Sequence, residues 1–126
     1  MKFLGKFEGI AYALLRIVIG FLFACHGAQK LFGVLGGHSM VHNPQMLVAG
    51  IVEFVGGVLI AIGLFTRIAA FISSGQMAVA YFTVHAHANG SFVPIVNQGE
   101  SAVMYCFIFL YIATHGTGKW GIQKNG

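Results

Sequence analysis

The chain has 126 residues, of which 57% are hydrophobic and only 8% carry a formal charge. A water-soluble domain of this size needs a polar outer surface, and this composition cannot build one. The formal net charge is +4, but the basic residues are scattered singly and form no cluster, which argues against nucleic acid as a partner. The composition therefore predicts a protein that is embedded in a lipid bilayer.

Four apolar runs follow one another along the chain, at residues 7–32, 46–65, 67–84 and 99–115. Each is near the length of about 20 residues that a membrane helix requires. The segments between them are short and rich in turn-forming residues. We therefore predict a single all-α domain over residues 1–126, folded as a four-helix transmembrane bundle.

The distribution of Lys and Arg predicts how the bundle is oriented. Lys30 lies at the end of the first run. It is therefore on the opposite side of the predicted bundle from the other basic residues of the loops and termini. Those basic residues lie in the N-terminus, the second loop or the C-terminus: Lys2, Lys6, Arg67, Lys119 and Lys124. We expect a multi-pass protein of the inner (cytoplasmic) membrane with both termini in the cytoplasm.

Two charged residues interrupt the apolar runs, Arg16 in the first and Glu53 in the second. Ionisable residues inside membrane spans are costly and often functional. At about 100° per residue, each shares a helix face with glycines that permit close packing, so both are expected to face the interior. Their offset along the bundle is about 8 Å, which long side chains could partly bridge, with Gln76 or a water between them.

Two interpretations of this polar interior stay open. Arg16 and Glu53 could form an ion pair that only fixes the register of the helices. Alternatively, they belong to a polar pocket that opens toward the outer leaflet, with Glu53 as a proton acceptor and His26 and Lys30 at the mouth. The further candidate pocket residues are Gln76, Tyr81 and Glu100.

Four histidines raise the question of a metal site. His38 and His42 have a spacing that suits zinc only on a helix, and His85 and His87 share a side only in an extended segment. The chain lacks any Asp and shows no carboxylate that would support such ligands, so we expect no metal. No serine belongs to a recognisable nucleophile arrangement, and whether the protein is an enzyme stays open.

Several motifs together resemble a known family. They are an arginine at position 16, HGAQKLFG at residues 26–33, GIVEFVGG at residues 50–57, and HGTGKWGI at residues 115–122. The combination, spread over nearly the whole chain, is similar to the DoxX family of small bacterial and archaeal membrane proteins. The resemblance singles out Arg16, His26, Gly27, Lys30, Glu53, Gly57 and the segment 116–120.

The resemblance implies a four-helix integral membrane protein. It also implies an association with redox partners, since the family takes its name from a component of a quinone-linked respiratory enzyme. This chain departs from the family pattern near its end. Thr117 stands where the family often has proline, and Gln123 stands near the place of an aspartate.

Three functions remain as hypotheses. The first is a redox-associated subunit that binds a quinone or quinol in the polar pocket, where a head group needs hydrogen-bonding groups in an apolar slot. The second is a non-catalytic scaffold for a membrane or soluble partner protein, or for further copies of itself. The third, a small-solute or proton conduit, is disfavoured because we find no inverted repeat.

Overall fold

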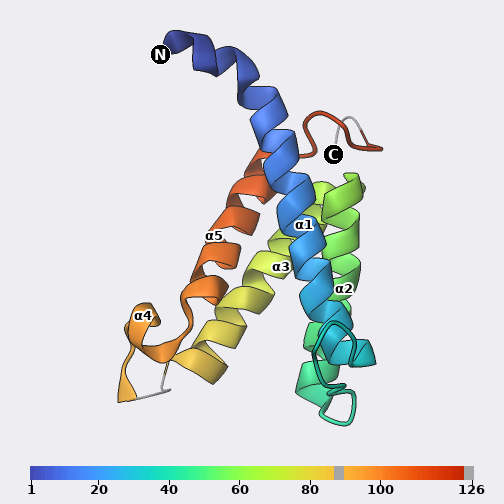
Figure 1. Cartoon of the computed structure of the whole chain (residues 1–126), viewed down its shortest axis with the longest axis vertical. Helices are drawn as coiled ribbons and strands as arrows, with labels where there is room; N and C mark the ends of the chain where they lie inside the picture. Colours follow the sequence, from blue (N-terminus) through green and yellow to red (C-terminus); the bar gives the residue numbers. More distant parts are fainter. Residues whose placement is uncertain (87–89, 124–126) are drawn as a thin grey trace.

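The fold is all-α, as the apolar runs predict. The structure, a computed structural model, describes residues 1–86 and 90–123. Figure 1 shows the elements in chain order: the 3-10 helix η1 (Lys2–Phe7), α1 (Glu8–Phe32), α2 (Pro44–Ile62), α3 (Thr66–Ala80), the π-helix η2 (Tyr81–His85), α4 (Pro94–Asn97) and α5 (Glu100–His115).

The boundaries of α2 illustrate why the helices begin and end where they do. The Asn43 side chain accepts hydrogen bonds from the backbone nitrogens of Gln45 and Met46, and Pro44 occupies the first helical position. Asparagine at the cap and proline in the first turn are both strong start signals. At the other end Gly63 adopts the left-handed conformation with φ of 74°, which closes the helix.

Two helical stretches are long and apolar enough to cross a membrane, Lys2–Phe32 and Pro44–Ile62. Helix α5 is apolar but shorter, with 16 residues. All four long helices expose large apolar side chains to the outside, for example Phe21, Val48, Phe71 and Phe107. Contiguous apolar surface of this kind is unusual on a soluble monomer.

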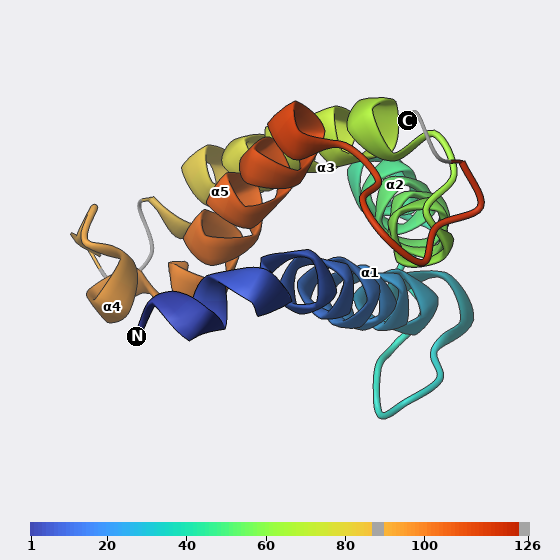
Figure 2. The ribbon, with the colours of Figure 1, turned by 90° about the horizontal axis from the view of Figure 1, so that it is seen from above.

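The long helices pack as two pairs, α1 with α2 and α3 with α5, and contacts between α2 and α3 join the pairs (Figure 2). Small residues let α1 and α2 approach closely. A Cβ atom on Gly20 would lie 2.6 Å from the backbone nitrogen of Ala61, and one on Gly57 would lie 2.5 Å from the Gly20 carbonyl oxygen. Close helix contact through glycine is typical of membrane bundles.

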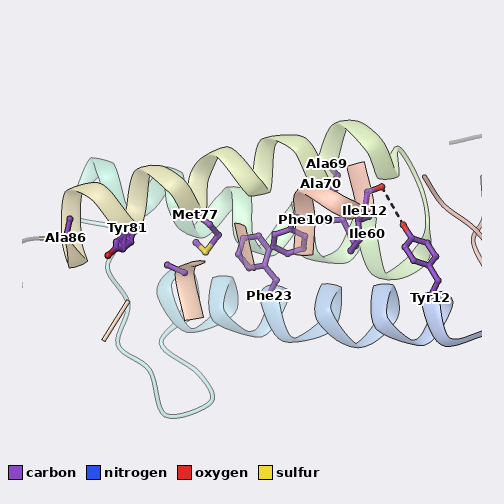
Figure 3. Packing of buried hydrophobic residues seen from close by; sticks show 11 residues of the cluster. Tyr12, Phe23, Ile60, Ala69, Ala70, Met77, Tyr81, Ala86, Phe109 and Ile112 are labelled. Atoms are coloured by element: carbon purple, nitrogen blue, oxygen red, sulfur yellow. Dashed lines mark hydrogen bonds between the residues drawn. The ribbon is translucent and has the colours of Figure 1, made fainter. Parts of the chain in front are cut away.

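The apolar core lies between the two pairs, where α1 and α2 face α5. Phe23 of α1 and Phe109 of α5 meet with their ring centroids 4.6 Å apart. Ile60 and Ile112 pack beside them and are fully buried (Figure 3). This packing holds the pairs together at mid-height.

Candidate functional site

A cavity of about 510 Å³ lies between the helix pairs. Its wall is mostly apolar and includes residues from α1, α2, α3, η2 and α5. The residues used in the argument below are Lys30, Glu53, Gln76, His85 and Tyr105. A largely apolar cavity with a few converging polar groups is the usual form of a small-molecule site.

An ion pair forms the polar part of this wall. Lys30 Nζ lies 2.6 Å from Glu53 Oε1 and 2.5 Å from Oε2. The Gln76 Nε2 group donates a further hydrogen bond of 3.2 Å to Oε2. Glu53 is only 1% exposed, so this carboxylate obtains its stabilisation from charge-assisted hydrogen bonds rather than from water. The three side chains come from α1, α2 and α3.

Gly50 makes room for the ion pair where α1 crosses α2. A Cβ atom at this position would come within 3.2 Å of Lys30 Cβ and 2.9 Å of a Leu31 methyl carbon. A larger residue at position 50 would therefore push the stem of Lys30 away. Gly50 lies one helical turn before Glu53. The glycine-containing face of α2 that the sequence predicts therefore also leaves room for the Lys30 side chain.

His26 and Tyr105 line the cavity from α1 and α5. Their rings meet edge to face, with centroids 5.9 Å apart and planes at 87°. His26 is exposed and Tyr105 is half-buried. The imidazole ring of His26 and the hydroxyl group of Tyr105 can each donate or accept a hydrogen bond. This part of the wall can therefore bind either a donor or an acceptor group of a ligand.

The π-helix η2 brings His85 to the cavity. Its Nδ1 atom lies 3.4 Å from the Asn97 carbonyl oxygen. π-helical turns are rare and frequently occur at functional sites. Tyr81 in the same turn does not line the cavity: its hydroxyl donates to the Phe92 carbonyl and accepts a 3.2 Å bond from Asn97 Nδ2. Tyr81 thus anchors the segment before α5.

Glu100, the other predicted pocket residue at this end, is exposed and lies outside the cavity wall. The structure therefore brings together His26, Lys30, Glu53 and Gln76 of the predicted set. It adds His85, which the sequence suggested only as a metal candidate, and Tyr105, which is not among the predicted pocket residues.

Arg16 lies elsewhere, at the other end of α1. It is fully buried, and its guanidinium donates only to backbone carbonyls. The Nε group bonds Ile60 at 3.0 Å, Nη1 bonds Lys119 at 2.7 Å and also Thr117, and Nη2 bonds Trp120 at 3.0 Å. The planar fork of five donors suits such a set of acceptors. Arg16 thus joins the end of α2 to the C-terminal segment.

The expected pairing of Arg16 with Glu53 is therefore wrong, although both side chains are buried. Arg16 and Lys30 are 14 residues apart in one helix, which is roughly 21 Å along its axis. Lys30 lies at the level of the Glu53 carboxylate and forms the ion pair with it. Gln76, expected between Arg16 and Glu53, contacts Glu53 alone of the two.

The C-terminal segment, residues 116–123, closes the Arg16 end of the bundle. The Thr117 hydroxyl donates to the Thr66 hydroxyl at 2.9 Å. The Gln123 side chain accepts a 2.8 Å hydrogen bond from the Phe65 backbone nitrogen. Gln123 thereby uses its amide oxygen as an acceptor, as an aspartate carboxylate could.

No group of three or more His, Cys, Asp or Glu side chains could hold a metal ion in residues 1–86 and 90–123. His38 and His42 are exposed in the loop between α1 and α2. His87 lies outside the described residues. So does Lys124, one of the basic residues from which the membrane orientation is predicted.

The fold and the cavity define a small helical protein with an apolar outside and a polar site between its helices. The DoxX family profile matches residues 11–86, and the chain belongs to this family. A protein of Haemophilus influenzae, named "Uncharacterized protein", is 44% identical over 130 residues, which cover 99% of this chain and 97% of the relative.

A second relative, from Bacillus subtilis, is named "Putative oxidoreductase CatD". It is 27% identical over 113 residues, covering 86% of this chain and 81% of the relative. No solved structure matches the chain significantly. The family assignment therefore comes from sequence, and the geometry of the site comes from the structure described above.

Proposed function

We propose that this protein crosses the inner membrane four times and binds the head group of a quinone or quinol in the cavity beside Glu53. In this proposal it acts as a redox-associated subunit. Its membership of the DoxX family and the oxidoreductase name of the Bacillus subtilis relative support a redox context.

The four-span arrangement is supported by the way the shorter helices combine. Helix α3 continues into η2, so together they cover residues 66–85, a length close to that of a membrane span. Lys2, Lys6 and Lys119 lie near the termini, and Arg67 lies in the first turn of α3. The positive-inside rule then assigns both termini to the cytoplasm.

The observation that carries the proposal is the combination of a buried ion pair with an apolar mouth. Val48 of α2 and Val79 of α3 line the cavity and are also 61% and 56% exposed. The cavity thus opens between these helices toward the surroundings of the bundle, which in a membrane are lipid. A quinone has a polar head for the ion-pair wall and an apolar tail for such a mouth.

The polar wall also suits the chemistry of this ligand class. Quinones take up protons on reduction and release them on oxidation, so the site benefits from groups that accept and donate protons. Histidine side chains do this near neutral pH, and carboxylates act as proton acceptors in general base catalysis. His26 and Glu53 both line the cavity, with Lys30 holding the charge of the carboxylate.

The test is to identify what co-purifies with the protein. The protein is extracted in mild detergent, and bound lipids are analysed by mass spectrometry for wild type and for Glu53→Gln. Glu100→Gln serves as the matched control, because Glu100 is exposed and lies outside the cavity wall. We expect a stoichiometric quinone in wild type and in the control, and its loss in Glu53→Gln.

Absence of both quinone and quinol from wild-type protein, together with no saturable binding of either when added, would overturn the proposal. Circular dichroism and size-exclusion profiles establish that each variant is folded. Loss of quinone from both variants alike would also count against a specific role of Glu53.

A second candidate function, a scaffold for a partner protein, is favoured by a different feature. A groove of about 350 Å³ lies between α2 and α3, with small residues on its floor and exposed Ile68 and Ile72 beside them. The floor includes Gly56, Ala69 and Ser73. Crosslinking in membranes from Ile68→Cys should trap one dominant neighbour, and an unlinked monomer would exclude this function.

A further inference from the structure

The hydrogen bond between Gln76 and Glu53 determines which way the Gln76 amide points. A carboxylate only accepts hydrogen bonds, so the Gln76 nitrogen must face it, at the observed 3.2 Å. The amide oxygen then points away from Glu53. This oxygen is buried and has no hydrogen-bond donor within the described ranges. A buried acceptor without a donor is unfavourable, and Gln76 lines the cavity.

His85 presents a second acceptor for a related reason. Its Nδ1 atom contacts the Asn97 carbonyl oxygen, and a carbonyl only accepts. In the tautomer that makes this hydrogen bond Nδ1 carries the hydrogen, and Nε2 of that tautomer is an acceptor. His85 also belongs to the cavity wall, on the side formed by η2.

The strongest donor on the same wall is mostly engaged. The Lys30 ammonium directs two of its three N–H donors to the oxygens of Glu53. His26 and Tyr105 can each donate or accept, so they do not favour one kind of ligand. The wall therefore holds acceptors in Gln76 and His85, while two of the three donors of its cation are committed to an ion pair.

We infer that the cavity selects the reduced form of its ligand, a hydroquinone, over the oxidised quinone. A hydroquinone offers two hydroxyl donors, whereas a quinone offers only carbonyl acceptors and would leave the Gln76 oxygen unpaired. This inference rests on the proposed quinone-class ligand and adds to it a preference for one redox state. Gln76 is the residue that determines the preference, and His85 strengthens it.

The test compares three probes on wild-type protein in lipid nanodiscs, without oxygen. The probes are decylubiquinone, decylubiquinol and the dimethyl ether of decylubiquinol, which keeps the ring and the tail but carries methyl groups in place of the two hydroxyl hydrogens. Binding is measured by titration calorimetry against empty nanodiscs. We expect decylubiquinol to bind at least about tenfold more tightly than the other two, which corresponds to one or two hydrogen bonds.

Equal affinity for the quinone and the quinol, or tighter binding of the quinone, would overturn this inference and leave the proposed function standing. Equal affinity of the quinol and its dimethyl ether would overturn it as well, because the hydroxyl donors would then have no effect. If neither the quinone nor the quinol binds, the proposed function fails and this inference fails with it.

A pair of variants then assigns the preference to Gln76. Gln76→Met removes the acceptor and retains the chain length, and it should reduce the ratio of quinol to quinone affinity several-fold while quinone still binds. Gln98→Met is the matched control, since Gln98 is exposed and lies outside the cavity wall. A ratio that falls equally in both variants, or in neither, would refute the role of Gln76.

Discussion

Lys30 Nζ lies within 2.6 Å of both carboxylate oxygens of Glu53, and this contact joins α1 to α2 at the wall of the cavity. The two partners differ in exposure: the lysine side chain is 26% exposed and the glutamate side chain 1%. The carboxylate therefore depends on the ammonium group, since little water reaches it. The ion pair both fixes the helix crossing and provides the charge of the site.

Removing Lys30 alone should destabilise the protein strongly. In Lys30→Met the buried carboxylate loses its cation, and breaking a buried pair in this way costs about 3–5 kcal/mol. The double variant Lys30→Met/Glu53→Gln should recover much of this loss, because no unpaired charge remains. The measurement is the free energy of unfolding in mixed micelles for both single variants and the double variant. Strictly additive effects would show that the two side chains do not interact.

Arg16 is expected to hold the C-terminal segment in place. Arg16→Lys keeps the charge but has a single nitrogen, so it cannot satisfy carbonyls of Ile60, Lys119 and Trp120 together. Each lost hydrogen bond to a charged group is worth about 1.5–3 kcal/mol. Hydrogen–deuterium exchange of residues 116–123 should therefore speed up, including the Ile122 and Gln123 amides, which donate to Ile62 and Gly63.

Arg67→Lys is the control for the Arg16 substitution. Arg67 of α3 also donates to backbone carbonyls, those of Ala113, Thr114 and His115 at the end of α5, but its side chain is exposed. Exchange in residues 116–123 should change little in this variant. Unchanged exchange in Arg16→Lys would show that the segment is held by its other contacts.

Much of the fold could be predicted from the sequence. The apolar runs located the long helices to within a few residues, because long apolar segments leave little choice of structure. The glycines beside Arg16 and Glu53 correctly predicted that both side chains are buried. The partners of Arg16 could not be found in this way, since they are backbone carbonyls and any residue type supplies one.

The cavity was harder to predict for a geometric reason. The position of a residue along a helix gives the level of its Cα atom, but not the level that a long side chain such as that of Lys30 reaches. Tyr105 looked like one aromatic residue among many in an apolar run, and nothing in the sequence marked the π-helical turn that brings His85 to the wall. Tyr81 and Glu100 were candidate pocket residues, but the structure places both outside the cavity wall.

Close packing of α1 on α2 should make Gly57 intolerant of any side chain. A Cβ atom there would lie 2.5 Å from the Gly20 carbonyl oxygen and would also meet Ala24. Because backbone atoms cannot yield easily, Gly57→Ala should lower the free energy of unfolding by about 1–3 kcal/mol.

Gly75 of α3 provides the matched comparison for Gly57, since a Cβ atom at this position meets nothing within 4 Å. Gly75→Ala should stabilise the helix by roughly 0.5–1 kcal/mol, because alanine restricts the unfolded chain. The same unfolding assay measures both variants. Equal effects of the two substitutions would contradict the close helix contact.

The mouth of the cavity provides the last prediction, which separates entry of a ligand from its binding. Val79 is 56% exposed and lines the cavity, so Val79→Trp should obstruct the opening between α2 and α3 without touching the ion pair. We expect quinone content after purification to fall several-fold. Val18→Trp is the control, because Val18 is exposed on α1 and lines neither the cavity nor the groove. If both variants retain full quinone content, the ligand enters by another route, and the apolar mouth no longer supports a membrane-derived ligand.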